Sequence, residues 1–361
     1  MPNRFKRALA SLGVSVSALV LALALSMLVI ALTGNDAGEA ARAMWDGAFG
    51  NRAQIAGTLS KMIPLLLVAL GWIVAYRARR VNIGFEGQIL AGGICATTVG
   101  LHFAGMPIVI HLPFAVMAGV AGGAIWAGIA AWLWARRGVN EIISTLLLNF
   151  IAIEIVSWLV RGPLQEPTKT FPRSGPIEES AQWPSLLDRT SLSWDFVLAI
   201  VMVFVVAFVL NRTTFGFRLR FTGANEPAAR HAGIATKTVT TIALVVSGAL
   251  AGLAGSSLIL GGESTSMSDN FSANFGFEGI VVALLARNNP IACIPSALLF
   301  AFLRQGGGLM EARVGVPSAV VLITQGLVII FVAGATFLLD RLKSERVDTT
   351  EPVVPTPVEV A

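Results

Sequence analysis

Acidic and amide side chains recur inside strongly apolar stretches of this sequence, and they are the residues that could do chemistry there. NIGFEGQ occupies residues 82–88, and NFGFEGI occupies residues 274–280. Five of the seven positions are identical, and each copy places one carboxylate, Glu86 or Glu278, among glycines. Such groups are costly in apolar surroundings and usually face a cavity or a partner helix. We therefore expect them either to hold broken helices together or to line a polar pathway.

A third polar group lies in VNEIISTLLLNF, and Glu154 follows further along the same apolar run. Helix residues spaced i, i+3, i+4 and i+8 share one face, and this is the spacing of Glu141, Ser144, Thr145 and Asn149. The sequence therefore predicts a polar stripe on this helix. Hydrogen bonding between helices would explain any one of these residues, but their number favours a pathway. The predicted pathway residues are Asn82, Glu86, Gln88, Asn140, Glu141, Ser144, Asn149, Asn274 and Glu278.

Catalysis fits these residues poorly. The sequence has no Ser/His/Asp arrangement and no H-E-x-x-H motif, and its three histidines are scattered. Its two cysteines, Cys95 and Cys293, lie inside apolar segments without metal-ligand spacing. It also has no G-x-x-x-x-G-K-[ST], so we do not expect this chain to bind ATP through a P-loop. The sequence predicts neither an enzyme nor a metal site.

Composition places the chain in the membrane class. Its 361 residues are 55% hydrophobic and only 13% charged, whereas soluble domains have about 25% charged residues. The net charge of +5 comes from basic residues at the ends of apolar runs, where positive charge sets membrane orientation. We therefore do not expect nucleic-acid binding.

Ten apolar runs are candidates for membrane-spanning helices, which need about 20 residues. The first is too long for a signal peptide and lacks a nearby cleavage site, so we expect it to be retained. The predicted fold is all-α and polytopic. The predicted spans are 14–32, 58–76, 81–100, 113–135, 139–160, 194–210, 238–260, 275–286, 290–303 and 316–339.

Charge asymmetry predicts the orientation of these spans. With both termini in the cytoplasm, 17 of the 26 Lys and Arg residues fall on the cytoplasmic side. Residues 1–340 would form the transmembrane domain, with loop 161–193 outside and loop 216–237 inside. The Pro-rich tail, residues 341–361, is expected to be disordered.

The duplicated motif opens the third and eighth predicted spans. Five crossings separate these two spans, so they should run in opposite directions, as in the inverted repeats of transporters. The two acids could both reach the membrane interior only if their segments are broken or re-entrant. Glycines also cluster within spans, for which close helix packing is a sufficient reason. These clusters are Gly92/Gly93, Gly119/Gly122/Gly123 and Gly248/Gly252/Gly255.

The predicted inner loop GFRLRFTGANEPAARHAGIATK contains a short amphipathic helix pattern. Asn225 can cap this helix, Pro227 suits its first turn and Gly233 can end it. Such a helix would lie on anionic lipid or dock on a soluble partner.

Several of these segments together resemble one known family. GFRLRFTGANEPAARHAGI is similar to the cytoplasmic coupling segment of permeases in ATP-binding-cassette importers for branched-chain amino acids, ribose and nucleosides. NIGFEGQ, VNEIISTLLLNF and GFEGIVVALLARNNP resemble the nucleoside or simple-sugar branch, as do GAFGN and KMIPLLLVALG. The motifs run in the expected order from about residue 47 to 290. Phe221 departs from the family, which has a small residue there, and this puts the local packing in question.

The resemblance implies about ten helices in a subunit of the bacterial inner membrane. It also implies a second, homologous permease subunit forming a heterodimer, an extracytoplasmic solute-binding protein, and cytoplasmic ATPases that bind ATP and Mg²⁺. This chain itself would carry no cofactor. By position, the residues that would dock on the ATPase are Gly223, Ala224, Asn225, Glu226, Ala228, Ala229, Arg230 and Gly233.

The EGQ form of the first motif and NEIISTLLLNF favour uptake of nucleosides, purine nucleosides above others, by alternating access. A simple sugar is the second candidate. A stand-alone proton-coupled transporter, with Glu86 and Glu278 as proton carriers, remains a third, and a membrane-embedded enzyme a fourth.

Overall fold

The structure is a computed structural model that describes residues 20–21, 24–28, 30–32, 34–103, 105–261, 265–316, 319–328, 330–331 and 334. The chain divides into two compact units, one of residues 41–313 and one formed by residues 1–40 and 314–361. The described residues form helices and irregular connections, so the all-α prediction is confirmed.

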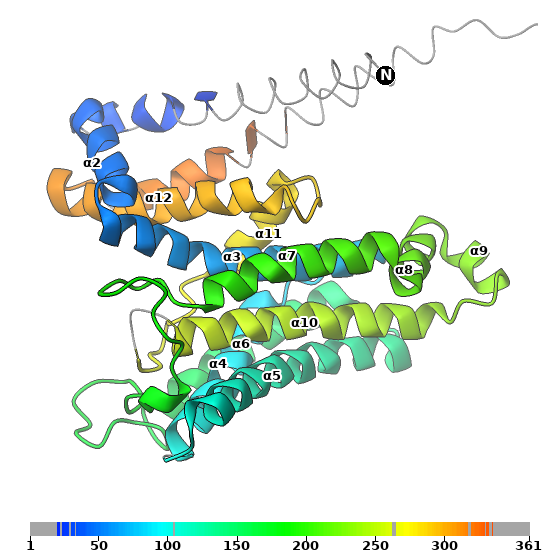
Figure 1. Cartoon of the computed structure of the whole chain (residues 1–361). Helices are drawn as coiled ribbons and strands as arrows, with labels where there is room; N and C mark the ends of the chain where they lie inside the picture. Colours follow the sequence, from blue (N-terminus) through cyan, green and yellow to red (C-terminus); the bar gives the residue numbers. More distant parts are fainter. Residues whose placement is uncertain are drawn as a thin grey trace, which may run out of the picture. The chain divides into compact units, whose positions relative to one another are not determined.

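Most of the helices belong to the unit of residues 41–313 (Figure 1). In chain order they are α2 (Ala37–Phe49, which begins before the unit), α3 (Arg52–Arg77), α4 (Phe85–His102), α5 (Ile108–Arg137), α6 (Glu141–Val160), the short η1 (Glu179–Ala181), α7 (Asp195–Arg212), α8 (Thr214–Ala224), α9 (Glu226–His231), α10 (Thr236–Leu260), α11 (Phe275–Leu285) and α12 (Cys293–Val314).

Six of these helices, α3, α5, α6, α7, α10 and α12, are long and apolar enough to cross a membrane. They differ in how much of their surface the protein covers. The apolar window of α3 is 83% buried, whereas those of α6 and α7 are each 28% buried. We infer that α3 is the central helix of this unit and that α6 and α7 present apolar faces outward.

Four predicted spans, 113–135, 139–160, 194–210 and 238–260, match α5, α6, α7 and α10 to within a few residues. The span predicted to begin at Thr58 begins six residues earlier, at Arg52. The prediction that a helix ends at Leu303 is wrong, because α12 continues to Val314. Arg304 and Gln305, which directly follow the predicted end, bond to other helices there.

The third and eighth predicted spans begin with, or directly after, a non-helical segment. Residues 81–84 are not helical, and α4 starts at Phe85. Helix α11 has only 11 residues, about 16 Å at 1.5 Å per residue, roughly half of a ~30 Å hydrocarbon core. It therefore begins inside the span rather than at a surface. The prediction of a loop at 216–237 missed one helix, because residues 216–224 belong to α8.

The unit formed by the two chain ends also has helical segments. The described residues between 20 and 32 are helical, and residues Ala319–Val328 form a short apolar helix. Nine of the 19 residues of the first predicted span and ten of the 24 residues of the tenth lie outside the described residues, as does the whole tail 341–361.

Glycines hold α4, α5 and α10 in close contact. A Cβ on Gly92 would come within 2.5 Å of the Gly252 Cα, and one on Gly123 within 2.3 Å of the Gly248 carbonyl oxygen. Backbones at these positions touch directly, as small residues allow in membranes. The interpretation of the glycine clusters as helix packing is confirmed for these residues.

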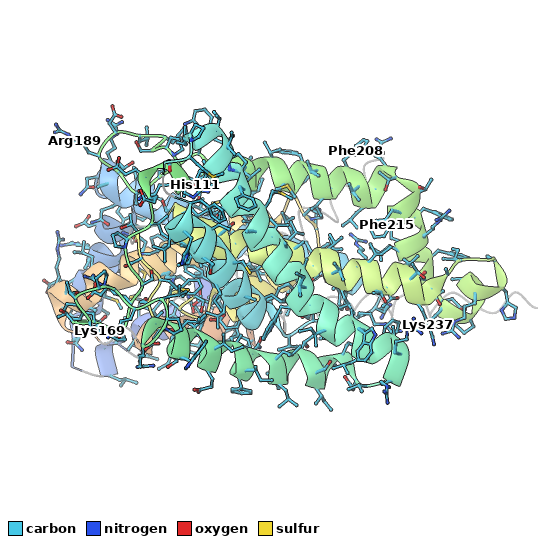
Figure 2. The ribbon with its side chains drawn as sticks, turned by 90° about the horizontal axis from the view of Figure 1, so that it is seen from below. His111, Lys169, Arg189, Phe208, Phe215 and Lys237 are labelled. Atoms are coloured by element: carbon cyan, nitrogen blue, oxygen red, sulfur yellow. The ribbon has the colours of Figure 1, made fainter. Side chains whose placement is uncertain are left out.

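The connections gather at two opposite ends of these helices. Figure 2 shows Lys169 and Arg189, from the 161–193 connection, at one end and Phe215 and Lys237 at the other. The first connection is tied down: Ile177 N donates to Thr265 O at 2.7 Å, and Trp183 N donates to Leu260 O at 2.9 Å. We call these the loop end and the coupling end.

Replacement of Gly252 by Ala should loosen this three-helix contact. The new Cβ would lie 2.3 Å from the Gly119 carbonyl oxygen, and the backbones would have to separate. We expect a loss of about 1–3 kcal/mol, measured as a lower melting temperature in detergent. Gly128→Ala on α5 is the control, because its Cβ would meet only the Val245 side chain at 3.9 Å. Equal melting of the two variants would contradict the packing role.

Candidate functional site

The break before α4 is held by a pair of buried amides. The Asn82 Nδ2 donates to the Gln88 Oε1 and to the Ser247 Oγ, each at 3.0 Å. The Asn82 Oδ1 accepts from the Gly84 N at 2.9 Å and from the Gln88 Nε2 at 3.0 Å. Buried polar groups need such partners. These two predicted pathway residues therefore close the non-helical segment on itself and on α10.

Helix α6 clamps the same break from its other side. The Thr145 Oγ1 accepts from the Ile83 N at 3.2 Å. The Asn149 amide accepts from the Gly87 N at 2.8 Å and donates to the Ile83 O at 2.9 Å. The predicted stripe thus faces α4, and its side chains supply the hydrogen bonds that an unbroken helix would make internally.

The first residues of the stripe have other partners. Asn140 caps α6 through the Ile142 N at 2.8 Å, as the N-cap preference of Asn predicts. The Ser144 Oγ donates to the Glu141 O at 3.3 Å. The Glu141 carboxylate turns toward the coupling end, where its partner is Arg80.

The Glu86 carboxylate joins the two copies of the motif. It accepts from the Gly276 N at 2.9 Å, from the Asn274 N at 3.2 Å and from the Ser272 hydroxyl. These donors form the start of α11, whose free N–H groups and dipole favour an anion. Glu86 is 3% exposed, so donors of the partner copy, rather than water, satisfy its carboxylate oxygens.

The two segments approach so closely that side chains are excluded. A Cβ on Gly276 would lie 2.4 Å from the Glu86 N. From this junction α4 runs toward the loop end, where the Gly100 O accepts from the Glu178 N. Helix α11 runs toward the coupling end, where the Asn288 O accepts from Arg77. The predicted opposite directions of the two copies are confirmed.

Glu278, the acid of the second motif copy, has different partners from Glu86. The Glu278 carboxylate, also buried, accepts from the Arg304 Nη1 of α12 at 2.7 Å. The same guanidinium lies 3.9 Å from the Phe275 ring centroid and donates to the Ala273 O at 2.6 Å. Ala273 and Asn274 have φ of 41° and 67°, a left-handed conformation that is unfavourable for Ala. Glu86 and Arg304 together hold this turn.

A cavity of about 260 Å³ opens beside the junction, on the side of the loop end. Its walls come from α3, the start of α7, the end of α10, segment 265–275 and α12. Charged side chains within apolar spans usually mark a functional site, and three line this cavity. They are Lys61, Asp195 and Arg304, accompanied by Ser60, Ser257, Ser266, Ser268, Phe271 and Phe275.

The coupling end carries the short helix predicted by NEPAARHAGI. It forms α9, in which the Asn225 Oδ1 accepts from the Ala228 N at 3.0 Å. Pro227 lies in the first turn, and Gly233 has φ of 79° just beyond the end. The helix and its three signals are confirmed, whereas docking by this segment stays a prediction. Phe221 packs on α8 itself, with its ring 5.8 Å from that of Phe217.

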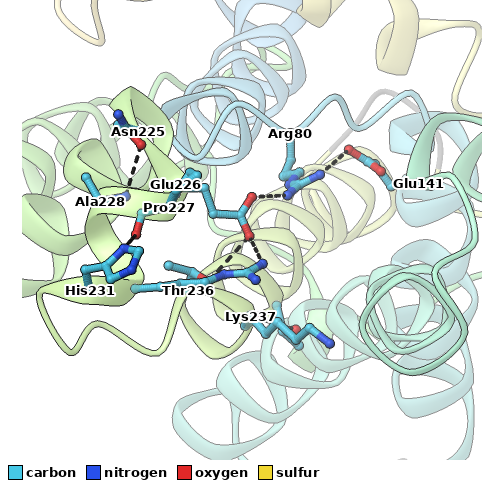
Figure 3. A network of polar contacts seen from close by, with 11 residues as sticks. Arg80, Glu141, Asn225, Glu226, Pro227, Ala228, His231, Thr236 and Lys237 are labelled. Atoms are coloured by element: carbon cyan, nitrogen blue, oxygen red, sulfur yellow. Dashed lines mark hydrogen bonds and ion pairs between the residues drawn. The ribbon is translucent and has the colours of Figure 1, made fainter.

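Arg80 links α9 to the polar stripe (Figure 3). Its Nη2 lies 3.0 Å from the Glu226 Oε2 and its Nη1 3.5 Å from the Glu141 Oε1. The guanidinium also lies 4.4 Å from the ring centroid of Trp134 at the end of α5. Glu226 in turn bonds Arg230 and Thr236. Arg80 therefore contacts α5, α6 and α9 directly, and Glu226 extends this connection to the start of α10.

The carboxyl of Glu226 lies outside the spans, and its pKa is below the ordinary value of 4.5. The main cause is the hydrogen bond from Arg230, to which the charge of Arg80 adds. Burial opposes this shift. At neutral pH the carboxylate is therefore charged and holds both arginines.

The structure brings most of the predicted residues into two groups. Asn82, Glu86, Gln88, Asn149 and Asn274 gather at the junction of α4 and α11. Glu278 lies one turn into α11, and Glu141 belongs to the coupling end. The residues predicted to dock on an ATPase lie in a second group, which is separate from the junction. The predicted roles of both groups stay predictions.

Sequence reasoning missed Arg80, Lys61, Asp195 and Arg304. Arg80 was treated only as an orientation charge. The available signals were cations within or beside apolar runs, Lys61 and Arg304, and an acid at the start of such a run, Asp195. The roles of these side chains depend on partners far away in the sequence, such as Gln305 for Lys61. Among the described residues, no group of His, Cys, Asp and Glu could hold a metal ion.

Replacement of Glu86 by Gln should weaken the start of α11. The amide keeps the size of the acid but places an NH₂ group against N–H donors, which costs about 1–3 kcal/mol. We expect a lower melting temperature and faster hydrogen exchange at residues 274–276. Glu179→Gln, at an exposed site, should change neither. Lost transport with unchanged exchange would instead make Glu86 a pathway residue.

Acidification should remove the contribution of the Glu226 carboxylate to the stability of the folded protein. A carboxyl whose folded pKa is depressed stabilises fully above its ordinary value of 4.5 and loses this as pH falls through the folded pKa. The melting temperature of the wild type should therefore exceed that of Glu226→Gln above pH 4.5 and approach it below. A difference that is independent of pH would contradict the pairing.

Comparison with known proteins adds to this geometry. The family described as branched-chain amino acid transport system / permease component matches residues 54–333. The glucose ABC transporter permease protein TsgB13 of Haloferax volcanii is 34% identical over 346 residues, 93% of this chain and 90% of the relative.

Two bacterial relatives are similar at the same level. The guanosine ABC transporter permease protein NupP of Bacillus subtilis is 33% identical over 93% of this chain and 98% of its own length. The nucleoside ABC transporter permease protein NupB of Lactococcus lactis is 33% identical over 79% of this chain and 80% of its own length. The chain also matches a second guanosine permease protein of Bacillus subtilis, NupQ, at 28% identity. With a family match across nearly all of its described helices, the chain is a multi-pass membrane protein and belongs to the branched-chain amino acid transport system permease family.

Proposed function

We propose that this chain is a permease subunit of an importer for nucleosides, purine nucleosides above others. The observation that carries the proposal is the similarity to NupP, which extends over 98% of that guanosine permease. The solute would be handed over by an extracytoplasmic binding protein and moved by alternating access. ATP hydrolysis would lie in a separate ATPase, with ATP and Mg²⁺ bound there, and this chain would carry no cofactor.

The coupling end supplies a physical route for the driving force. Movement of α9 with an ATPase would act on Glu226 and, through Arg80, on Glu141 at the start of α6. Helix α6 clamps the break before α4 through Thr145 and Asn149, and Glu86 ties α4 to α11. These contacts are contiguous, which supports a mechanical connection between docking helix and junction.

A second permease subunit would cover the outward face of α6. Glu154 lies near the middle of this span and is exposed, in a shallow pocket with Phe150, Ile151 and Trp158. A carboxylate at such a depth does not face lipid but a partner or a water-filled path. NupP and NupQ are two guanosine permease proteins of one bacterium, which supports a heterodimeric pair here.

The subunit would lie in the bacterial inner membrane with both termini cytoplasmic. The coupling end would then face the cytoplasm and the 161–193 connection the outside. The cavity beside the junction would open toward the binding protein, and its serines and Asp195 suit a solute rich in hydroxyl groups.

Two alternatives have specific observations attached. The similarity to TsgB13, a glucose permease, favours a simple sugar as the second candidate. A stand-alone proton-coupled transporter would need Glu86 or Glu278 to release a proton during transport. Glu86 accepts three hydrogen bonds and Glu278 pairs with Arg304, so a proton-carrying cycle would have to break these contacts, which counts against this alternative.

Uptake by cells carrying and lacking this chain tests the proposal. Labelled guanosine and adenosine should enter only with the chain present, whereas ribose and galactose should enter equally in both. ATP depletion should abolish this uptake, and an uncoupler applied with ATP maintained should not. Lost sugar uptake with unchanged nucleoside uptake would select the sugar alternative, and survival of uptake after ATP depletion would select the proton-coupled one.

A further inference from the structure

Four arginines line one pocket at the coupling end. The pocket has a volume of about 420 Å³ and is formed by the end of α3, the end of α8 and the turn after α11. Its lining residues are Tyr76, Arg77, Arg79, Arg220, Gly223, Ala224, Arg287 and Asn288. None of these eight is acidic. The function proposed above gives this pocket no role.

The arrangement holds positive charges together at an energetic cost. Arg77 is half-buried, and its Nε is buried without a hydrogen-bond partner among the described residues. Repulsion is strongest at Arg77, because Arg79, Arg220 and Arg287 are exposed to water. A buried donor without an acceptor, such as the Arg77 Nε, is unfavourable. An oxyanion entering the pocket would remove both costs, since guanidinium groups match carboxylate and phosphate oxygens in geometry.

The backbone fixes these arginines in place. Arg79 and Arg287 have φ of 56° and 53°, left-handed values that are unusual for residues other than Gly, Asn and Asp. Helix α8 packs directly on the end of α3, since a Cβ on Gly223 would lie 2.1 Å from the Arg77 O. Arg77 also donates to the Asn288 O at 3.2 Å. The pocket is thus built by packed backbone rather than by flexible side chains alone.

Its position indicates what kind of anion reaches it. The pocket surrounds the end of α3, the span most covered by protein, whereas lipid headgroups would surround the outward-facing helices. Its wall includes Gly223 and Ala224, which directly precede α9. Arginines that only set the orientation of a span do not need to line a pocket. Arg136 and Arg137, at the end of α5, are examples, because both are exposed.

We propose that this arginine pocket receives an acidic side chain of the ATPase subunit, beside the docking helix α9. The inference rests on the proposed function, because it requires a separate ATPase. The occupant is a carboxylate group from a protein segment, held by charge-assisted hydrogen bonds. Such contacts would make the arginine pocket a second anchor that keeps α3 and α11 in register with the moving ATPase.

The test uses the ATPase that co-purifies with the full chain, and measures its Kd for the permease in nanodiscs. Arg79→Gln with Arg220→Gln should raise this Kd by about tenfold or more, because two charge-assisted bonds are lost. Both side chains are exposed and their removal relieves repulsion, so the melting temperature of the permease alone should not fall. Arg136→Gln with Arg137→Gln is the matched control and should bind as the wild type does. Arg79→Lys with Arg220→Lys should retain much of the affinity, which separates charge from packing.

Three results would overturn the inference. Unchanged affinity of the double Gln variant would exclude an ATPase carboxylate. So would equal losses in the control variant, which would indicate general attraction to basic charge. Stabilisation of the wild type by phosphatidylglycerol nanodiscs over phosphatidylcholine, lost in the double Gln variant while ATPase affinity is unchanged, would assign the pocket to lipid. A wild-type chain that retains no ATPase would instead reject the proposed function itself.

Discussion

The contact between the Glu86 carboxylate and the start of α11 is the constraint on which the interior of residues 41–313 depends. Two helices that begin inside the membrane region leave free N–H groups there, and lipid offers no hydrogen bonds to satisfy them. The chain solves this by bringing the two beginnings together, so that an acid from one satisfies donors of the other. Gly276 is required at this point because the backbones nearly touch.

Other features of the interior follow from these broken helices. The break before α4 leaves backbone groups that α6 satisfies through Thr145 and Asn149, so α6 cannot move without disturbing α4. The turn before α11 needs left-handed residues, and Arg304 of α12 holds it. Polar side chains within the spans thus form a connected network, while glycines bring α4, α5 and α10 close enough for the network to close.

This network ends at Arg80, where it meets α9, the proposed docking helix. An ionic contact between Glu226 and Arg80 is modest for exposed groups, but here the arginine also contacts Glu141 and the Trp134 ring. Shared partners make such residues act together rather than independently. The coupling end therefore combines a stiff local helix with a connection to the membrane interior, a combination that suits transmission of movement.

The sequence by itself determined the membrane class, the approximate limits of four long apolar helices, the capped helix α9 and the opposite directions of the two motif copies. These depend on signals that can be read directly from the sequence: hydropathy, a capping Asn, a Pro in the first turn, and the odd number of predicted crossings between the two motif copies. It did not predict that α12 continues past Arg304, that Glu86 caps α11 or that Arg80 joins three helices. Only the tertiary structure decided these, because the stability of a charged group within a span depends on the partner that the fold brings to it. For Glu86 that partner lies 190 residues away at Gly276, a distance at which no local pattern in the sequence could identify it.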